Sequence, residues 1–318
     1  MHPAKSVIFF TVASGAGYGL FIWIAVLSYA RLIPPVPGFG LTALFLSLGL
    51  IVSGLLSSTF HLGHPERAWR ALSQWRSSWL SREGVIAILT FIPLGIFSIG
   101  WIFFQNNSGI VAVIGLAGAL MSLITVFTTS MIYASLKTIP AWHNIWTKLV
   151  YIILCLMSGG VLMLALTEVF GMMEVGGIIH LPVIFLLIFG FVIKIIYWRH
   201  IHTSKPISTA ESATGLGRFG KVSLAASPHG EDNFLLKEMG FEIARKHAKK
   251  IRIIASFLAF IVPGALIAIG IYFAGGTSGA AAIILAAAIC FIGLAFERWL
   301  FFAEAKHVVT LYYGESKI

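Results

Sequence analysis

The chain has 318 residues, of which 58% are hydrophobic and 11% are charged, and its mean hydropathy is +0.93. Soluble domains carry about 25% charged residues, so this composition excludes a water-soluble protein. The formal net charge of +10 would point to nucleic acid in a soluble chain, but in a membrane protein basic residues first report topology. We therefore expect an all-α, polytopic membrane protein with the lipid bilayer, and no nucleic acid, as a partner.

Hydropathy predicts eight membrane-spanning helices in one domain over residues 1–318. They are expected near residues 7–30, 41–61, 85–104, 110–136, 149–171, 177–197, 252–274 and 279–301. The first apolar run begins at Val7 and extends past about twenty residues without a small-residue cleavage site. It is therefore interpreted as a span, and an even number of spans puts both termini on one side of the membrane.

The connections between these spans form two alternating sets. Those at residues 33–40, 105–109, 172–176 and 275–278 are short and nearly uncharged, whereas those at 62–84, 137–148 and 198–251 and the tail after 302 are longer and basic. Of the 22 lysines and arginines, 21 belong to the basic set, and only Arg31 lies beside the uncharged loops. By the positive-inside rule, the basic loops and both termini are predicted to be cytoplasmic.

The connection at residues 198–251 differs from the others in its length and composition. It is polar, contains glycine and serine, and becomes amphipathic from Asn233 to Lys250. We expect a cytoplasmic insert that ends in a helix. It is interpreted either as a solvated loop on anionic lipid headgroups or as a docking surface for a soluble partner.

The densest polar cluster runs from His61, at the end of the second span, to Glu83, at the start of the third. Three tryptophans interleaved with four arginines suit a segment that lies along the lipid headgroups. That interpretation leaves His61 and Glu83 unexplained, because they close two adjacent helices at the same depth. Ionisable residues at that depth are candidates for function, and a histidine beside a carboxylate can exchange protons near neutral pH. A hydrogen bond at the helix end is the alternative for His61.

Four other ionisable residues of the spans have more ordinary interpretations. Glu297 and Arg298 are expected to form an internal ion pair, with a proton path as the alternative. Glu168 and Lys194 lie toward the ends of their spans, so their charged groups are expected to reach the membrane surface.

Neither a metal cluster nor a haem is expected in this chain. Cys155 and Cys290 lie singly in apolar runs with no neighbouring histidine, which excludes a resident iron–sulfur cluster. Haem in a membrane anchor usually needs histidines on facing helices, and His61 and His180 lie toward opposite ends of their spans.

Two motifs resemble a known family. HLGHPERA at residues 61–68, followed by SRE at 81–83, is similar to the membrane anchor of dimethyl sulfoxide reductases (DmsC type), and so is TIPAWHNIW at 138–146. The resemblance extends weakly to RWLFF at 298–302. It implies eight helices in a bacterial cytoplasmic (inner) membrane, a four-cluster iron–sulfur subunit, a molybdopterin catalytic subunit, and a quinone that reacts at the anchor. The family's quinol-binding histidine carries over to His61, and its functionally linked glutamate to Glu83.

The sequence departs from the reductase pattern in two places. The acidic residue of the last span stands at Glu297, directly before Arg298, so no inherited role is assigned to it. The large insert at 198–251, with MHPA at the start and FFTVASG at 9–15, resembles the anchor of cytoplasmic sulfite dehydrogenases, the SoeC branch. Charge bears on this choice independently, because the face with His61 and Glu83 is on the basic side. We therefore expect both partner subunits on the cytoplasmic side, whereas dimethyl sulfoxide reductases carry the catalytic subunit in the periplasm.

The sequence thus predicts an anchor that passes electrons from sulfite oxidation to ubiquinone or menaquinone. His61 donates a hydrogen bond to a quinone carbonyl, with His64 as its possible substitute; Arg67 or Arg82 supplies positive charge; and Glu83 exchanges protons. One alternative is quinol oxidation that feeds a reductase of dimethyl sulfoxide, thiosulfate, polysulfide or tetrathionate. A transporter, which would need broken helices or charges at mid-bilayer, and a purely structural tether are the others.

Overall fold

The computed structural model describes residues 4–204, 206–226, 246–273 and 276–318, and for His61 it describes the backbone without the side chain. Eight helices in this part of the chain are long and apolar enough to cross a membrane, which confirms the predicted fold class. Seven of them are α1 (Lys5–Tyr29), α2 (Pro37–Ser57), α3 (Trp79–Phe104), α4 (Gly109–Ala134), α5 (Ile145–Val169), α6 (Met173–Thr203) and α12 (Thr277–Ala303). The chain is a multi-pass membrane protein.

The remaining span consists of three continuous pieces, α10 (Ala248–Ser256), the π-helical turn η4 (Phe257–Ile261) and α11 (Val262–Tyr272). Proline lacks a backbone N–H, so Pro263 cannot donate to the carbonyl four residues earlier, that of Ala259. The wide π turn lies directly before this proline. The thiol of Cys290 on α12 donates to the Ala259 carbonyl instead, at 3.5 Å, so this free cysteine has a structural role.

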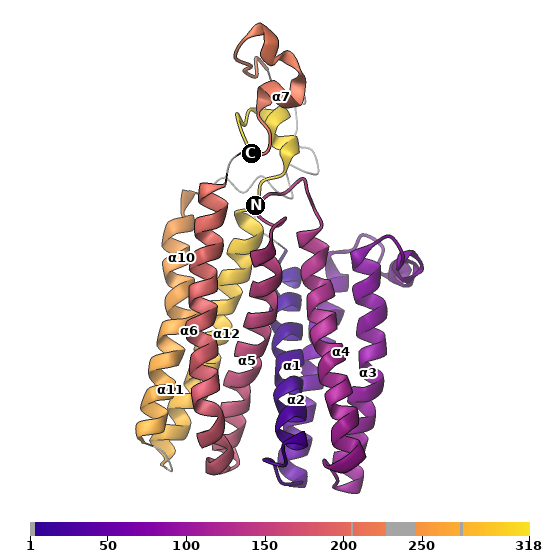
Figure 1. Ribbon diagram of the computed structural model, residues 1–318, viewed down its shortest axis with the longest axis vertical. Helices are drawn as coiled ribbons and strands as arrows, with labels where there is room; N and C mark the ends of the chain where they lie inside the picture. Colours follow the sequence, from indigo (N-terminus) through magenta and orange to yellow (C-terminus); the bar gives the residue numbers. More distant parts are fainter. Residues whose placement is uncertain (1–3, 205, 227–245, 274–275) are drawn as a thin grey trace.

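The helices run side by side along the long axis of the molecule (Figure 1). α1 is central, because it packs on α2, α4, α5 and α12, while α3 packs on α4, α5 on α6, and α11 on α12. Both chain ends are marked at the same end of the bundle in Figure 1, where the basic connections also lie. That this end faces the cytoplasm stays a prediction from the positive-inside rule.

α1 and α5 cross with almost no space between their backbones. A Cβ atom added to Gly159 of α5 would lie 2.1 Å from the carbonyl carbon of Gly19 on α1, so only glycine fits there. The indole Nε1 of Trp23 donates to the carbonyl oxygen of Leu156 at 2.9 Å and fixes the same contact. Small residues allow this close approach of apolar helices, and it sets the positions of the polar side chains on both helices.

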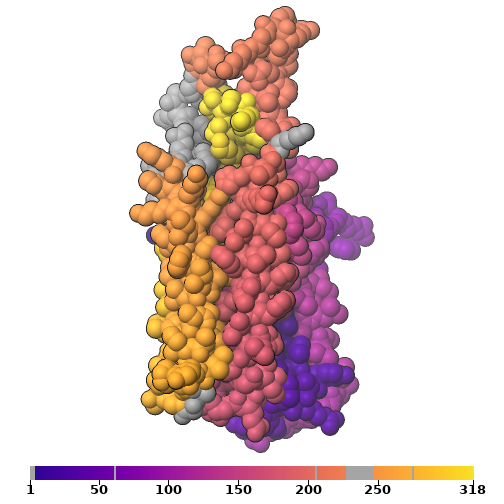
Figure 2. Space-filling model, turned by 60° about the vertical axis from the view of Figure 1, so that its left-hand side comes forward, coloured from indigo at the N-terminus to yellow at the C-terminus, as the bar shows by residue number. Residues whose placement is uncertain are grey.

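A small cap of insert and tail stands above the bundle (Figures 1 and 2). It contains α7 (Ala210–Thr214), η3 (Leu216–Phe219) and, from the C-terminal tail, η5 (Val308–Tyr313). The Tyr312 hydroxyl donates to the carbonyl of Ala213 at 2.8 Å, and the backbone N–H of Ile207 donates to the carbonyl of Ile318 at 2.7 Å. The first part of the insert is therefore joined to the tail. Of the helix predicted over 233–250, residues 233–245 lie outside the described part of the chain.

Candidate functional site

Two short 3-10 helices connect α2 to α3 at the end of the bundle that carries the basic loops. They are η1 (Ser58–His61) and η2 (Pro65–Gln74). In η2 and the turn after it, Trp69 and Trp75 are exposed, and the guanidinium groups of Arg70 and Arg76 lie 5.7 and 5.5 Å from their ring centres. An exposed band of indole rings paired with guanidinium groups has the chemistry of a segment at headgroup level.

Three of the predicted site residues are held at this surface. His64 is exposed, and its Nδ1 lies 3.1 Å from Oε1 of Glu66, which Arg67 Nε also approaches at 3.6 Å. Arg82 donates from Nε to the carbonyl of Trp75 at 3.0 Å and from Nη2 to that of Arg76 at 2.7 Å. These contacts use Arg82 to fix the turn before α3, and they leave it directed away from the bundle interior.

Glu83 has the opposite orientation. The side chain of Ser78 caps the first turn of α3, and this start directs Glu83 inward, where it is only 6% exposed. Its Oε1 accepts a hydrogen bond from the Thr129 hydroxyl of α4 at 3.1 Å. Tyr18 of α1 and Tyr133 of α4 are within electrostatic reach of the carboxylate. The carboxylate predicted from sequence is thus a buried, hydrogen-bonded group between three helices.

His61 lies in η1, the turn that ends α2 and packs on α1. Its side chain is outside the described part of the structure, so the predicted pairing with Glu83 stays a prediction. The backbone places the two residues at the same end of the bundle, on adjacent helices that pack together.

The predicted pair of Glu297 and Arg298 on α12 is confirmed and is part of a larger cluster. Arg298 Nε lies 2.5 Å from Oε2 of Glu297, and Lys194 Nζ of α6 lies 2.5 Å from Oε1. The expectation that Lys194 reaches the membrane surface is wrong, since its side chain is only 1% exposed. The buried carboxylate of Glu297 gives the ammonium group a partner inside the bundle, which removes the need to reach water.

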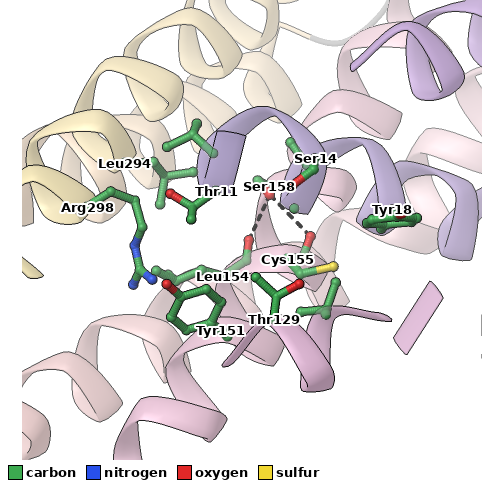
Figure 3. A pocket seen from close by; sticks show the side chains of 14 residues that line it. Thr11, Ser14, Tyr18, Thr129, Tyr151, Leu154, Cys155, Ser158, Leu294 and Arg298 are labelled. Carbon is green, nitrogen blue, oxygen red and sulfur yellow. Dashed lines mark hydrogen bonds between the residues drawn. The ribbon is translucent and has the colours of Figure 1, made fainter. Parts of the chain in front are cut away.

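A cavity of about 30 Å³, with several polar groups in a mainly apolar wall, lies between α1, α4, α5 and α12 (Figure 3). Its wall includes Tyr18, Thr129, Tyr151 and Arg298. Figure 3 shows the Arg298 guanidinium beside the Tyr151 ring, with Thr129 between them and Tyr18. Sequence reasoning missed this cavity, because its wall comes from four helices that are far apart along the chain.

The second and third motifs of the sequence meet in space. The Trp142 indole donates from Nε1 to the carbonyl of Phe301 at 2.8 Å and stacks on the Phe301 ring at 5.5 Å. The Tyr197 hydroxyl of α6 donates to the carbonyl of Ala141 at 3.1 Å. The connection at 137–148 is therefore locked onto the ends of α6 and α12.

In the described residues, no three His, Cys, Asp or Glu side chains gather as a metal site would require.

Comparison with known proteins gives one family. Residues 1–221 match the family described as DMSO reductase anchor subunit (DmsC). The chain is 32% identical to the sulfite dehydrogenase subunit designated C of Allochromatium vinosum, over 98% of this chain and 99% of the relative. It is 31% identical to the anaerobic dimethyl sulfoxide reductase chain designated C of Escherichia coli, over 37% of this chain and 42% of the relative. The anaerobic dimethyl sulfoxide reductase chain YnfH, also from E. coli, is 28% identical over 40% of this chain and 43% of the relative.

Proposed function

Because this chain belongs to the DMSO reductase anchor subunit (DmsC) family, we propose that it is the quinone-reacting membrane anchor of a complex that oxidises sulfite. As a family member it is an anchor subunit of a DMSO reductase-type complex. The choice of sulfite rests on coverage, since the likeness to the sulfite dehydrogenase subunit extends over 98% of the chain. The likeness to the first of the two dimethyl sulfoxide reductase relatives extends over only 37%.

The observation that carries the proposal is the buried carboxylate of Glu83. The Glu83 carboxylate is 6% exposed in an apolar bundle and accepts one hydrogen bond, from the Thr129 hydroxyl. Burial of such a group lowers the stability of the bundle, which favours a functional role for it. It lies at the same end as the turn with His61, and Phe60 and Leu80 beside these two residues are exposed apolar side chains. This setting fits a quinone, which needs a hydrogen-bond donor, a proton-exchanging group and an apolar surface for its ring and tail.

Each group has a defined task in this proposal. Reduction of the quinone to quinol consumes two electrons, supplied by an iron–sulfur partner subunit, and two protons. His61 donates a hydrogen bond to a carbonyl oxygen, and Glu83 passes the two protons to the reduced quinone in turn and is reprotonated from water after each transfer. The molybdopterin catalytic subunit, which oxidises sulfite, and the iron–sulfur subunit dock on the end with the basic loops. We propose that this end is cytoplasmic, in a bacterial inner membrane.

The test uses the complex purified through a tag on this chain. Sulfite-dependent reduction of a short-chain quinone should fall about 100-fold in His61→Ala and in Glu83→Gln, as loss of a proton-transfer group predicts. Sulfite oxidation with ferricyanide should not change, because that acceptor bypasses the anchor. Glu174→Gln is the matched control, since Glu174 is an exposed carboxylate in the first turn of α6, at the other end of the bundle. Quinone reduction at the wild-type rate in both site variants would refute the assignment.

The second candidate function is the reverse electron flow, from quinol to a reductase subunit. It is favoured by the 31% identity to the first dimethyl sulfoxide reductase relative, which extends over 124 residues. The same variants distinguish the two, because a reductase complex would oxidise quinol with a sulfoxide or sulfur-compound acceptor and would show no sulfite-dependent quinone reduction.

A further inference from the structure

The interior charges of the bundle are unbalanced at the Lys194 cluster. Two cations, Lys194 and Arg298, share the single carboxylate of Glu297, and all three side chains are at most 5% exposed. A buried cluster with a surplus positive charge needs a counter-charge nearby, because an uncompensated charge in a low-dielectric interior costs several kcal/mol. Two other buried carboxylates lie at this end of the described bundle: Glu304, whose Oε1 lies 2.7 Å from Nε of Arg252, and Glu83. Glu304 already has a cation as its partner, so Glu83 is the carboxylate that would cancel the surplus.

The cavity in Figure 3 adjoins this cluster. Arg298 is on one side of it, and Thr129, which donates to Glu83, is on its wall as well. The cavity therefore lies against a cation of the cluster and against the hydrogen-bond partner of Glu83.

Three polar atoms at the cavity have no hydrogen bond of good geometry among the described residues: Tyr18 Oη, Tyr151 Oη and Arg298 Nη2. The Tyr151 side chain still interacts with Arg298, and the Tyr18 side chain with Thr125. All three side chains are more than nine-tenths buried. Buried donors without partners are rare in folded proteins and usually mark a bound water or ligand. Because a water needs about 10–15 Å³ of such space, a cavity of about 30 Å³ has room for about two waters.

We propose that this cavity is a water site through which Arg298 acts as the counter-charge of Glu83. Water accepts hydrogen bonds from Arg298 Nη2 and the tyrosine hydroxyls, and it donates to Thr129 Oγ1, whose own proton is shared between Glu83 and the carbonyl of Thr125. Arg298 keeps its proton and acts by its charge, while Glu297 and Lys194 hold it in place. This proposal rests on the proposed role of Glu83, and it assigns to Arg298 the positive charge that sequence reasoning sought in Arg67 or Arg82.

The ionisable groups that face Glu83 and the cavity come from every element packed there. They are Tyr18 on α1, Tyr133 on α4, Tyr151 and Cys155 on α5, Lys194 on α6, and Glu297 and Arg298 on α12. The side chain of His61 in η1 is not described. Tyrosine and cysteine are neutral near pH 7, so the charged groups of this set are those of the cluster.

The first experiment compares two variants that remove the same charge. Arg298→Gln leaves Glu297 paired with Lys194, and Lys194→Met leaves it paired with Arg298, so each retains a neutral pair. Loss of Arg298 removes stabilisation of ionised Glu83. The pH profile of quinone turnover should have a midpoint that belongs to Glu83 and that is absent in Glu83→Gln. In Arg298→Gln this midpoint should rise by about 0.5–1 pH unit, which is less than for a direct contact. Lys194→Met should shift it by a smaller amount, and Arg298→Lys should restore the wild-type midpoint.

Two outcomes overturn the proposal. Equal shifts in Arg298→Gln and Lys194→Met would mean that the cavity has no part in the coupling, and an unchanged midpoint in Arg298→Gln would mean that there is no coupling.

The second experiment does not depend on turnover. An experimental density map of the complex at about 2 Å resolution should contain water within hydrogen-bond distance of Arg298 Nη2, and a dry cavity would refute the site. A wild-type complex without quinone turnover would refute the proposed function alone, because the water site is still decided by the map.

Discussion

At the scale of single residues, the buried cluster on α6 and α12 makes a prediction about stability. Glu297→Gln leaves Lys194 and Arg298 as adjacent buried cations with no counter-charge between them, a change that costs about 3–5 kcal/mol in buried ion pairs. The melting temperature of the purified complex in detergent should fall much further in Glu297→Gln than in Lys194→Met, which keeps a neutral pair.

The matched control for that comparison is the pair of Lys306 and Glu315 in the tail. Their charged atoms lie 2.9 Å apart, but both side chains are about one-third exposed, so water screens the interaction. Glu315→Gln should cost no more than about 1 kcal/mol. A melting temperature that is lowered equally by Glu315→Gln and Glu297→Gln would contradict the account of a cluster held by its buried carboxylate.

At the scale of elements, the crossing of α1 and α5 sets the shape of the cavity. Gly159→Ala would place a Cβ atom 2.1 Å from the backbone of Gly19, so the helices must separate. Overpacking of this kind costs about 1–3 kcal/mol, and we expect a lower melting temperature together with slower quinone turnover, because both helices line the water site. Gly49→Ala in α2 is the control, since a Cβ atom there meets nothing within 4 Å. A Gly159→Ala complex as stable as Gly49→Ala would contradict the close crossing.

At the scale of the whole molecule, the distribution of charge predicts the orientation in the membrane. Twenty-one of the 22 basic residues belong to the basic connections or to the helix ends nearest them in the sequence, so alkaline phosphatase fused in the loops at 33–36 or 105–108 should be active in the periplasm. The same reporter fused after Lys221 or after Ile318 should be inactive, and a fluorescent protein at those positions should fluoresce. Phosphatase activity at position 221 would reverse the topology and would place the partner subunits on the other side.

The sequence by itself determined the number of spans, their bounds to within six residues, and the candidates His61 and Glu83. The spans follow from the sequence because hydropathy is averaged over windows of about twenty neighbouring residues. The two candidates follow because they lie at the facing ends of two consecutive helices. The partner of Lys194, the close contact of Gly19 with Gly159, and the cavity wall were decided by the tertiary structure. Membrane helices such as α5 and α12 are apolar nearly all round, so their sequence carries little signal of which face meets a neighbour. Rotation about each helix axis is set by packing. That rotation placed Lys194 against Glu297, and it placed Arg298 on the wall of the cavity.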